Sequence, residues 1–210
     1  MFNKDGKGIL IAVGGGESGE ITKDSIKIFE RFLEYAGGLE NAKILIMTVA
    51  TNNPEDAGKR YQELFDHLKF KNFEIVNIAD RVESFDKKIL KKVEAATGLY
   101  FTGGNQLHIT ALMGGTPLHQ LILDKFGKGL VIGGTSAGAM MMSSSTLVSG
   151  EADTAPRLGA IEVAPGMELL DNSIIDTHFS QRGRHGRLLS AVVHNPQALG
   201  FGIDERTAMI

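Results

Sequence analysis

The segment Gly134-Thr135-Ser136-Ala137-Gly138 holds a serine between two glycines and matches the pattern G-x-S-x-G. It follows the apolar run 130–132, which predicts a strand, and precedes a segment that predicts a helix. That context is typical of a nucleophile elbow, a sharp strand-to-helix turn that exposes a serine hydroxyl at a helix N-terminus. We therefore predict Ser136 as a nucleophile and the N–H group of Ala137 as a donor to an oxyanion.

A serine nucleophile needs a base, and His178 is the best candidate among the six histidines of the chain. It follows the apolar run 173–176, so it is expected at a strand end, on the same edge of the sheet as Ser136. A carboxylate usually orients such a base, and Asp204 and Glu205 both follow the next predicted strand. Only one of these two carboxylates can face the site, and the residues alone leave the choice open.

Further candidates complete this constellation. Glu151 and Asp153, in a segment without regular pattern, are the fallback for the carboxylate. Gly104 follows another apolar run and is expected to supply a second oxyanion donor. The order serine, histidine, acid differs from the order serine, acid, histidine of the α/β-hydrolases, so the elbow is expected in a different family.

Three arginines, Arg182, Arg184 and Arg187, follow His178 closely in a chain whose net charge is −3. Arginine forks bind carboxylates through two parallel hydrogen bonds. Arginines at the start of a helix oppose its dipole, which favours a functional over a stabilising role. We predict that these arginines bind a substrate carboxylate near the scissile bond.

Other kinds of site find little support in the sequence. The chain has no Cys, which excludes disulfides, thiolate nucleophiles and iron–sulfur clusters. Gly14-Gly15-Gly16-Glu17-Ser18-Gly19 formally fits the dinucleotide pattern G-x-G-x-x-G, but the end of the second predicted strand carries no acid to hold a ribose. We expect no cofactor and no metal, and the acidic net charge gives no basic field for nucleic acid.

Alternating apolar runs and amphipathic segments must position these residues. Apolar runs predict strands at 9–13, 44–49, 73–79, 99–102, 130–132, 173–176 and 198–203. Helical spacing predicts helices at about 22–36, 54–68, 84–96, 117–125, 137–144 and 181–194. The alternation predicts an α/β fold with a doubly wound, mostly parallel sheet sandwiched by helices.

The 210 residues are expected to form a single α/β hydrolytic domain. No apolar run reaches the roughly 18 residues that span a bilayer, and the start of the chain lacks a signal-peptide pattern. We therefore expect a cytoplasmic protein with no membrane partner. The apolar run 207–210 resembles a strand cut short, so we also expect a chain truncated at its C-terminus.

Four motifs taken together resemble a known family. They are Gly133-Gly134-Thr135-Ser136-Ala137-Gly138-Ala139, Thr102-Gly103-Gly104-Asn105-Gln106, Asp176-x-His178-Phe179 with Arg182, Arg184 and Arg187, and Gly202-Ile203-Asp204-Glu205-x-Thr207-Ala208. The family is that of cyanophycinase and its relatives, serine peptidases that include the aspartyl dipeptidases. The resemblance implies a flavodoxin-like fold related to the class I glutamine amidotransferases, with serine in place of their cysteine.

The resemblance also implies roles for individual residues. It implies Ser136 as nucleophile, His178 as base and Glu205 as the acid in preference to Asp204. It implies a substrate pocket made by Gln106, Asp176, Arg182, Arg184 and Arg187. The family cleaves cyanophycin, a polyaspartate that bears arginine on its side chains, into β-Asp-Arg dipeptides. A serine exopeptidase for such peptides is thus expected, with Asp176 holding a substrate guanidinium, and the family suggests a homodimer.

Two other functions stay open. An α-aspartyl dipeptidase is the rival within the family, because Thr177 stands where cyanophycinases have Gln directly before the histidine. A non-catalytic binding protein on the same scaffold is the rival from another class, because members of the family continue past the last motif with further strands.

Overall fold

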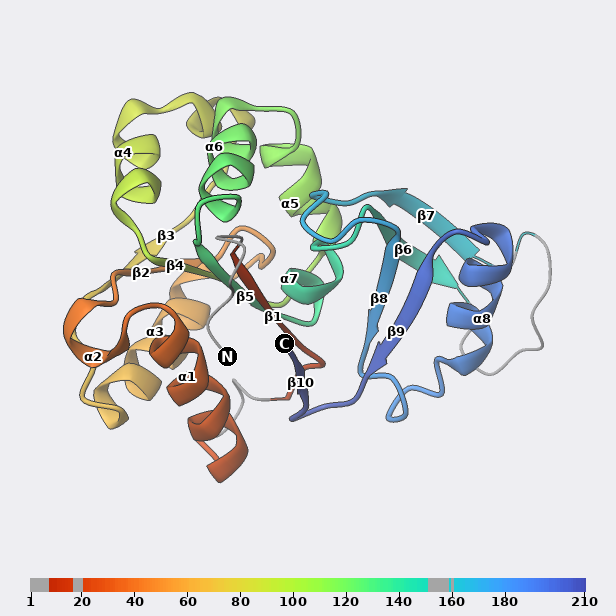
Figure 1. Cartoon of the computed structure of the whole chain (residues 1–210), viewed down its shortest axis with the longest axis horizontal. Coiled ribbons are helices and arrows are strands. Elements are labelled where there is room, and N and C mark those ends of the chain that lie inside the picture. Colours follow the sequence, from red (N-terminus) through yellow and green to blue (C-terminus); the bar gives the residue numbers. More distant parts are fainter. Residues whose placement is uncertain (1–7, 17–20, 151–158, 160) are drawn as a thin grey trace.

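The computed structural model describes residues 8–16, 21–150, 159 and 161–210, in which strands and helices alternate (Figure 1). The strands are β1 (Ile9–Val13), β2 (Ile44–Met47), β3 (Phe73–Val76), β4 (Gly98–Phe101), β5 (Val131–Thr135), β6 (Ser145–Gly150), β7 (Ile161–Pro165), β8 (Ser173–Thr177), β9 (Leu199–Ile203) and β10 (Ala208–Met209). The helices are α1 (Lys23–Tyr35), α2 (Gly38–Asn41), α3 (Pro54–His67), α4 (Lys87–Ala95), α5 (Gln106–Met113), α6 (Pro117–Phe126), α7 (Ala137–Met140) and α8 (His185–His194), with a 3₁₀ helix η1 at Arg81–Phe85. None of the described helices is both long and apolar enough to cross a bilayer.

The central sheet has six strands in the order β10-β1-β5-β4-β2-β3. The strands β1, β5, β4, β2 and β3 run parallel, and β10 pairs antiparallel with β1. Parallel neighbours require crossover connections, which the helices between them supply. The prediction of a doubly wound, mostly parallel sheet sandwiched by helices is confirmed.

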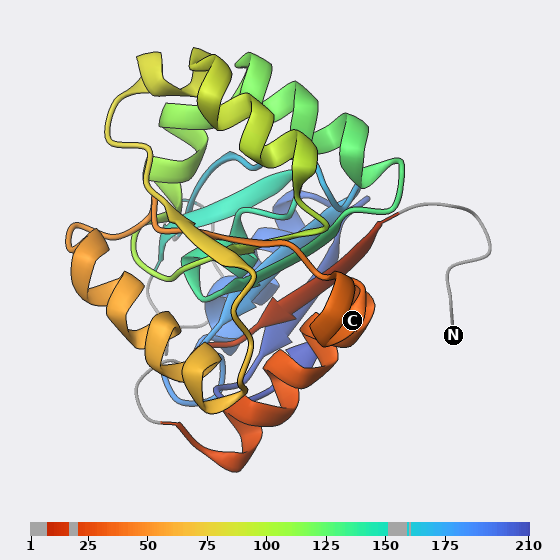
Figure 2. The same cartoon turned by 90° about the vertical axis from the view of Figure 1, so that its left-hand side faces the viewer.

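Successive side chains of the central strands point to opposite faces of the sheet and belong to two apolar layers. In β1, Ile11 and Val13 join the layer beneath α1 and α3, whereas Ala12 joins the layer beneath α4, α5 and α6. In β2, Ile46 belongs to the first layer and Leu45 to the second. Figure 2 shows the two groups of helices on opposite sides of the sheet. Burial on both faces explains why these strands are continuous apolar runs in the sequence.

Two smaller sheets lie beside the central one (Figure 1). β6 pairs antiparallel with β7, and β8 pairs in parallel with β9. The predicted strands at 173–176 and 198–203 therefore do not extend the central sheet, because β10 occupies the free edge of β1. The end of β8 still reaches β1, since the His178 N–H donates to the Gly14 carbonyl at 2.8 Å.

Two helices near the candidate site are shorter than predicted. The helix expected at 137–144 ends at Met140, because the Met141 carbonyl accepts the N–H of Met167 and the Met142 carbonyl accepts those of Leu169 and Leu170, instead of N–H groups from a next helical turn. The helix expected at 181–194 begins at His185, because Gly183, with a φ of 58°, interrupts the chain just before it. The turn that precedes α8 thus holds Arg182 outside the helix.

Candidate active site

Ser136 lies in the sharp turn between β5 and α7, in a conformation that few non-glycine residues adopt. Its φ is 51° and its ψ is −114°, and no side-chain hydrogen bond caps the helix that follows. A Cβ on Gly134 would lie 2.2 Å from the Gly138 carbonyl oxygen, and a Cβ on Gly138 would lie 2.3 Å from the Phe101 carbonyl oxygen. Both glycines of the G-x-S-x-G pattern are therefore required by close backbone approach, and the turn stores strain of the kind found at functional sites.

His178 bridges Ser136 and Glu205 through its two ring nitrogens. Nε2 lies 3.0 Å from the Ser136 Oγ, and Nδ1 lies 2.6 Å from the Glu205 Oε1. An ionised carboxylate only accepts, so Nδ1–H donates to Glu205 and Nε2 is left to accept the serine proton. The His178 side chain is 12% exposed and that of Glu205 is 37% exposed, so the relay opens to solvent on its carboxylate side. This geometry suits proton transfer away from a nucleophilic hydroxyl.

The two candidate carboxylates at the end of β9 take different partners. Glu205 contacts the imidazole, whereas the Asp204 Oδ1 accepts the backbone N–H of Ser180 at 2.8 Å. That N–H and the Ser180 hydroxyl lower the pKa of Asp204. The backbone N–H of Glu205 donates to the Gln181 Oε1 at 3.2 Å. Asp204 thus fastens the turn that carries His178, and Glu205 is the carboxylate beside the ring.

Two backbone turns border the Ser136 side chain. Within the described residues, the N–H groups of Ala137 and Gly104 donate to no acceptor. Ala137 begins α7, so its N–H is one of those that a helix leaves unpaired. Of the two glycines after β4, Gly103 lies closer to the Ser136 side chain, since a Cβ on it would be 3.5 Å from the Ser136 Cβ. The α-carbon of Gly104 instead packs against the Ala50 carbonyl. The turn after β4 therefore lies where a second oxyanion donor is needed.

Asp176 differs most from its expected place. It is fully buried, and its Oδ2 accepts Arg187 Nε at 2.6 Å. Its Oδ1 accepts Arg187 Nη2, Arg184 Nη1 at 3.1 Å and the Thr177 N–H at 2.9 Å. Both oxygens are thus occupied by groups of the chain itself. The expectation that Asp176 holds a substrate guanidinium is corrected, because no face of this carboxylate is open.

The hydrogen bonds to Asp176 keep two of the three arginines largely buried. Arg187 and Arg184 are 8% and 13% exposed at their side chains and both bind Asp176. Burial and the nearby charge of Arg187 lower the pKa of Arg184. Arg182 is exposed and, within the described residues, its side chain has no hydrogen-bond or ion-pair partner. Of the predicted carboxylate ligands, Arg182 alone is therefore free to meet a substrate.

Two further predicted positions take local roles. The Gln106 Nε2 donates to the Leu147 carbonyl at 2.5 Å, which ties the start of α5 to β6. Thr177, at the position before His178, is completely buried. Glu151 and Asp153 lie outside the described residues. Within the part of the chain that is described, no three acidic or histidine side chains gather as metal ligands would.

Some residues around the site were not singled out by their sequence pattern. Gln181 holds the Glu205 backbone, and no local motif marks it. Gly15 and Gly16 lie against His178 and Glu205, where added Cβ atoms would approach to 2.2 Å and 3.2 Å. The run of glycines after β1 is a visible signal in the sequence, where it formally fits a dinucleotide loop at a strand end. The described residues Gly14–Gly16 instead contact this site.

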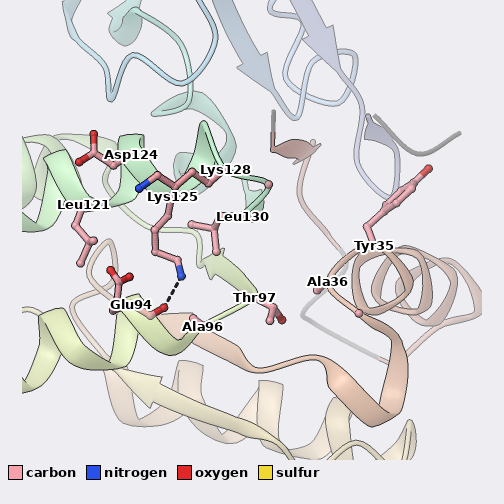
Figure 3. Close-up of a pocket in the computed structure, with 12 residues that line it drawn as sticks. Tyr35, Ala36, Glu94, Ala96, Thr97, Leu121, Asp124, Lys125, Lys128 and Leu130 are labelled. Carbon is pink, nitrogen blue, oxygen red and sulfur yellow. Dashed lines mark hydrogen bonds between the residues drawn. The ribbon is translucent and has the colours of Figure 1, made fainter. Parts of the chain in front are cut away.

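A separate pocket of about 510 Å³ lies at the amino ends of the central strands, opposite to the end that carries Ser136 (Figure 3). Its lining comes from the ends of α1, α4 and α6 and from Thr97 and Leu130, near the starts of β4 and β5. Lys125 crosses it to donate to the Glu94 carbonyl. Because Ser136 follows the opposite end of β5, this pocket is distinct from the Ser136–His178 contact.

Comparisons with known proteins match nearly the whole chain. The profile of peptidase family S51 matches residues 10–210. A cyanophycinase of Geminocystis herdmanii is 35% identical over 202 residues, which are 96% of this chain and 73% of that protein. A cyanophycinase of Synechococcus elongatus is 33% identical over 205 residues, which are 96% of this chain and 62% of that protein. The chain thus spans between 62% and 73% of the length of these relatives.

A solved structure shares the fold. The crystal structure of a peptidase from an acI-B1 actinobacterium has a TM-score of 0.73 to this chain at 22% identity, covering 99% of this chain and 84% of that one. At this identity the likeness bears on the fold alone. It agrees with the expected class I glutamine amidotransferase-like architecture.

Proposed function

The chain belongs to peptidase family S51, a family of serine-type peptidases, and from this premise we propose that it hydrolyses cyanophycin or related β-aspartyl-arginine peptides. The substrate class is supported by cyanophycinase relatives at 35% and 33% identity. The observation that carries the mechanism is the contact of His178 with Ser136 at 3.0 Å and with Glu205 at 2.6 Å.

The proposed reaction proceeds through an ester on Ser136. As Oγ attacks the scissile carbonyl, its proton passes to His178 Nε2, and Glu205 stabilises the imidazolium through Nδ1–H. The oxyanion accepts hydrogen bonds from the N–H groups of Ala137 and Gly104. Collapse of this intermediate breaks the C–N bond, and the imidazolium gives its proton to the leaving amine. Water, deprotonated by His178, then attacks the ester and restores the serine hydroxyl.

Arg182 is the proposed contact for substrate charge. Arg184 and Arg187 both bind the buried carboxylate of Asp176, whereas the guanidinium of Arg182, four residues after His178, is exposed and has no partner among the described residues. A guanidinium binds a carboxylate through two parallel hydrogen bonds. The free α-carboxylate of an aspartyl unit linked through its side chain is a group of this kind. Arg182 therefore favours substrates that keep a carboxylate beside the scissile amide.

Assays on two substrate types test the proposed specificity. We expect release of β-Asp-Arg dipeptides from cyanophycin and no cleavage of α-aspartyl dipeptides. Chromatography of the products measures both. Cleavage of the α-aspartyl dipeptides alone would make the chain an aspartyl dipeptidase. If neither substrate is cleaved while cyanophycin binds, the chain is a binding protein on a peptidase scaffold.

Substitution of Glu205 by Gln is expected to lower kcat by about 10²- to 10⁴-fold, because an amide neither stabilises the imidazolium nor fixes its tautomer. The matched control is Asp204→Asn, which changes the neighbouring carboxylate that binds Ser180 instead of the ring. We expect its kcat to fall by less than about tenfold, since its contact does not reach the imidazole. Steady-state kinetics of both variants decide between the two acids, and the reverse order of effects would reassign the role to Asp204.

A further inference from the structure

The end of β1 contacts each of the three chain segments that form the site. Three consecutive carbonyl oxygens accept backbone N–H groups from three separated stretches. The bonds are Ser136 N–H to Val13 O at 3.0 Å, His178 N–H to Gly14 O at 2.8 Å, and Arg206 N–H, next to Glu205, to Gly15 O at 2.8 Å. Since the three acceptors are adjacent in one chain segment, their spacing is set by covalent geometry. One short piece of backbone thus fixes the relative positions of the serine, histidine and acid segments.

Gly15 also meets the imidazole itself. A Cβ at this position would lie 2.2 Å from the His178 Cε1 and 2.6 Å from Nε2. Carbon atoms in van der Waals contact stay about 3.5 Å apart, so the ring occupies the space that any side chain at residue 15 would need. The ring is also held by Glu205, whose Oε1 lies 2.6 Å from Nδ1. The imidazole therefore contacts both the bare α-carbon of Gly15 and the Glu205 carboxylate.

Backbone conformation alone does not account for this contact. Gly15 has a φ of 110°, and Gly37, in the loop after α1, has a similar φ of 123°. Apart from its own chain neighbours, a Cβ on Gly37 would come no closer than 3.2 Å to any atom, and the atoms nearest to it belong to Asn41 and Ala42, at the end of α2. The two glycines share the demand for a positive φ, but only Gly15 is pressed against a side chain of the site. Their comparison separates backbone strain from displacement of the ring.

We propose that Gly15 is a positioning residue that holds the His178 imidazole at hydrogen-bonding distance from Ser136, and that Val13–Gly15 is the template on which the site assembles. The proposal rests on the function proposed above. Gly15 acts through His178, and it leaves substrate binding to other residues. Its loss is therefore expected to lower kcat and leave KM unchanged.

The substitution Gly15→Ala tests the proposal against Gly37→Ala. A methyl at residue 15 must push the ring by more than an ångström, a misplacement that typically costs about 10²-fold in rate. We expect kcat to fall by about 10²-fold in Gly15→Ala and to stay within about twofold of the wild-type value in Gly37→Ala, with similar losses in melting temperature. A kcat for folded Gly15→Ala that matches Gly37→Ala would overturn the proposal.

A second readout does not depend on turnover. The proton shared by His178 Nδ1 and Glu205 should give a far-downfield ¹H NMR signal in the wild type and in Gly37→Ala, and the signal should be lost or shifted in Gly15→Ala. An unchanged signal in Gly15→Ala contradicts the proposal even if no substrate is cleaved. Retained activity in Ser136→Ala, by contrast, would refute the proposed function without bearing on this signal.

A third variant covers failure of Gly15→Ala to fold. Gly16→Ala places a Cβ 3.2 Å from the Glu205 Oε2, at a φ of 77°. The smaller displacement is expected to lower kcat on the order of tenfold and to shift the same NMR signal. Wild-type kcat and an unshifted signal in Gly16→Ala would contradict the template role of this loop.

Discussion

Replacement of Ser136 by alanine is expected to lower kcat for β-Asp-Arg release by roughly 10⁴- to 10⁶-fold, the range found when a serine nucleophile is removed from a working relay. The cause is the loss of the hydroxyl oxygen that lies 3.0 Å from His178 Nε2 and would attack the substrate. Without it the ester intermediate cannot form, and only binding and oxyanion stabilisation remain. Single-turnover and steady-state kinetics on cyanophycin measure the change.

The variant should stay folded, because the Ser136 side chain caps no helix end and, among the described residues, its hydroxyl has a hydrogen bond only with the imidazole. Its melting temperature is expected to remain close to that of the wild type. A matched control is Ser84→Ala, which removes a buried hydroxyl that donates to the Leu112 carbonyl, away from the site. That variant is expected to lose about 1 kcal/mol of stability and no activity. Equal activities of the two variants would contradict the proposed mechanism.

Replacement of Asp176 by asparagine is expected to lower the free energy of unfolding by about 3–5 kcal/mol, the usual cost of removing one partner from a buried ion pair. Asp176 is fully buried and binds Arg187 through both oxygens and Arg184 through one. The amide keeps the shape of the carboxylate but removes the one negative charge that both guanidinium groups bind in a poorly solvated place. Urea unfolding of the purified variant measures the loss.

An exposed ion pair supplies the matched control for this substitution. The Glu74–Lys92 pair, with a distance of 2.7 Å and side chains that are 57% and 43% exposed, makes the same kind of contact in water. Glu74→Gln is therefore expected to cost less than about 1 kcal/mol. If Asp176→Asn lowers the free energy of unfolding by as little as this control, the ion pairs of Asp176 with Arg184 and Arg187 do not stabilise the fold. The two arginines would then again be candidate ligands for a substrate carboxylate.

The elbow was the part of the site most open to prediction from sequence. Its geometry depends on five consecutive residues, and the glycines at 134 and 138 are needed where the backbone comes within 2.3 Å of an added Cβ. His178 could be placed at a strand end by the apolar run before it. The structure brings Ser136, His178 and Glu205 together as expected, and their catalytic roles stay a prediction.

The surroundings of Asp176 were not predictable in the same way. The family resemblance alone implied that Asp176 lines the substrate pocket, and on a regular strand it would share a face with His178, two residues later. His178 has a φ of 48°, so the alternation ends there and the ring turns toward Ser136 while Asp176 stays buried beneath Arg187. A left-handed residue other than glycine leaves no clear mark in a sequence.

The choice between Asp204 and Glu205 was open for a related reason. Both follow β9, and the turn at Ser180 and Gln181, 24 residues earlier in the chain, gives them different roles. Ser180 binds the Asp204 carboxylate, whereas Gln181 binds the backbone N–H of Glu205 and leaves its carboxylate for the ring. Such contacts arise only when two strand ends meet. Likewise, the Gly14–Gly16 loop could be recognised as a close-approach turn, but the segments that approach it come from distant positions.

The most direct test of the central claim is reaction with a serine-directed phosphonate followed by mass spectrometry of the labelled peptides. The account predicts one adduct, on the peptide that contains Ser136, formed in the wild type and in Asp204→Asn but suppressed in His178→Ala. An enzyme that cleaves cyanophycin yet carries its label on another residue, or that labels Ser136 equally fast without the imidazole, would contradict it.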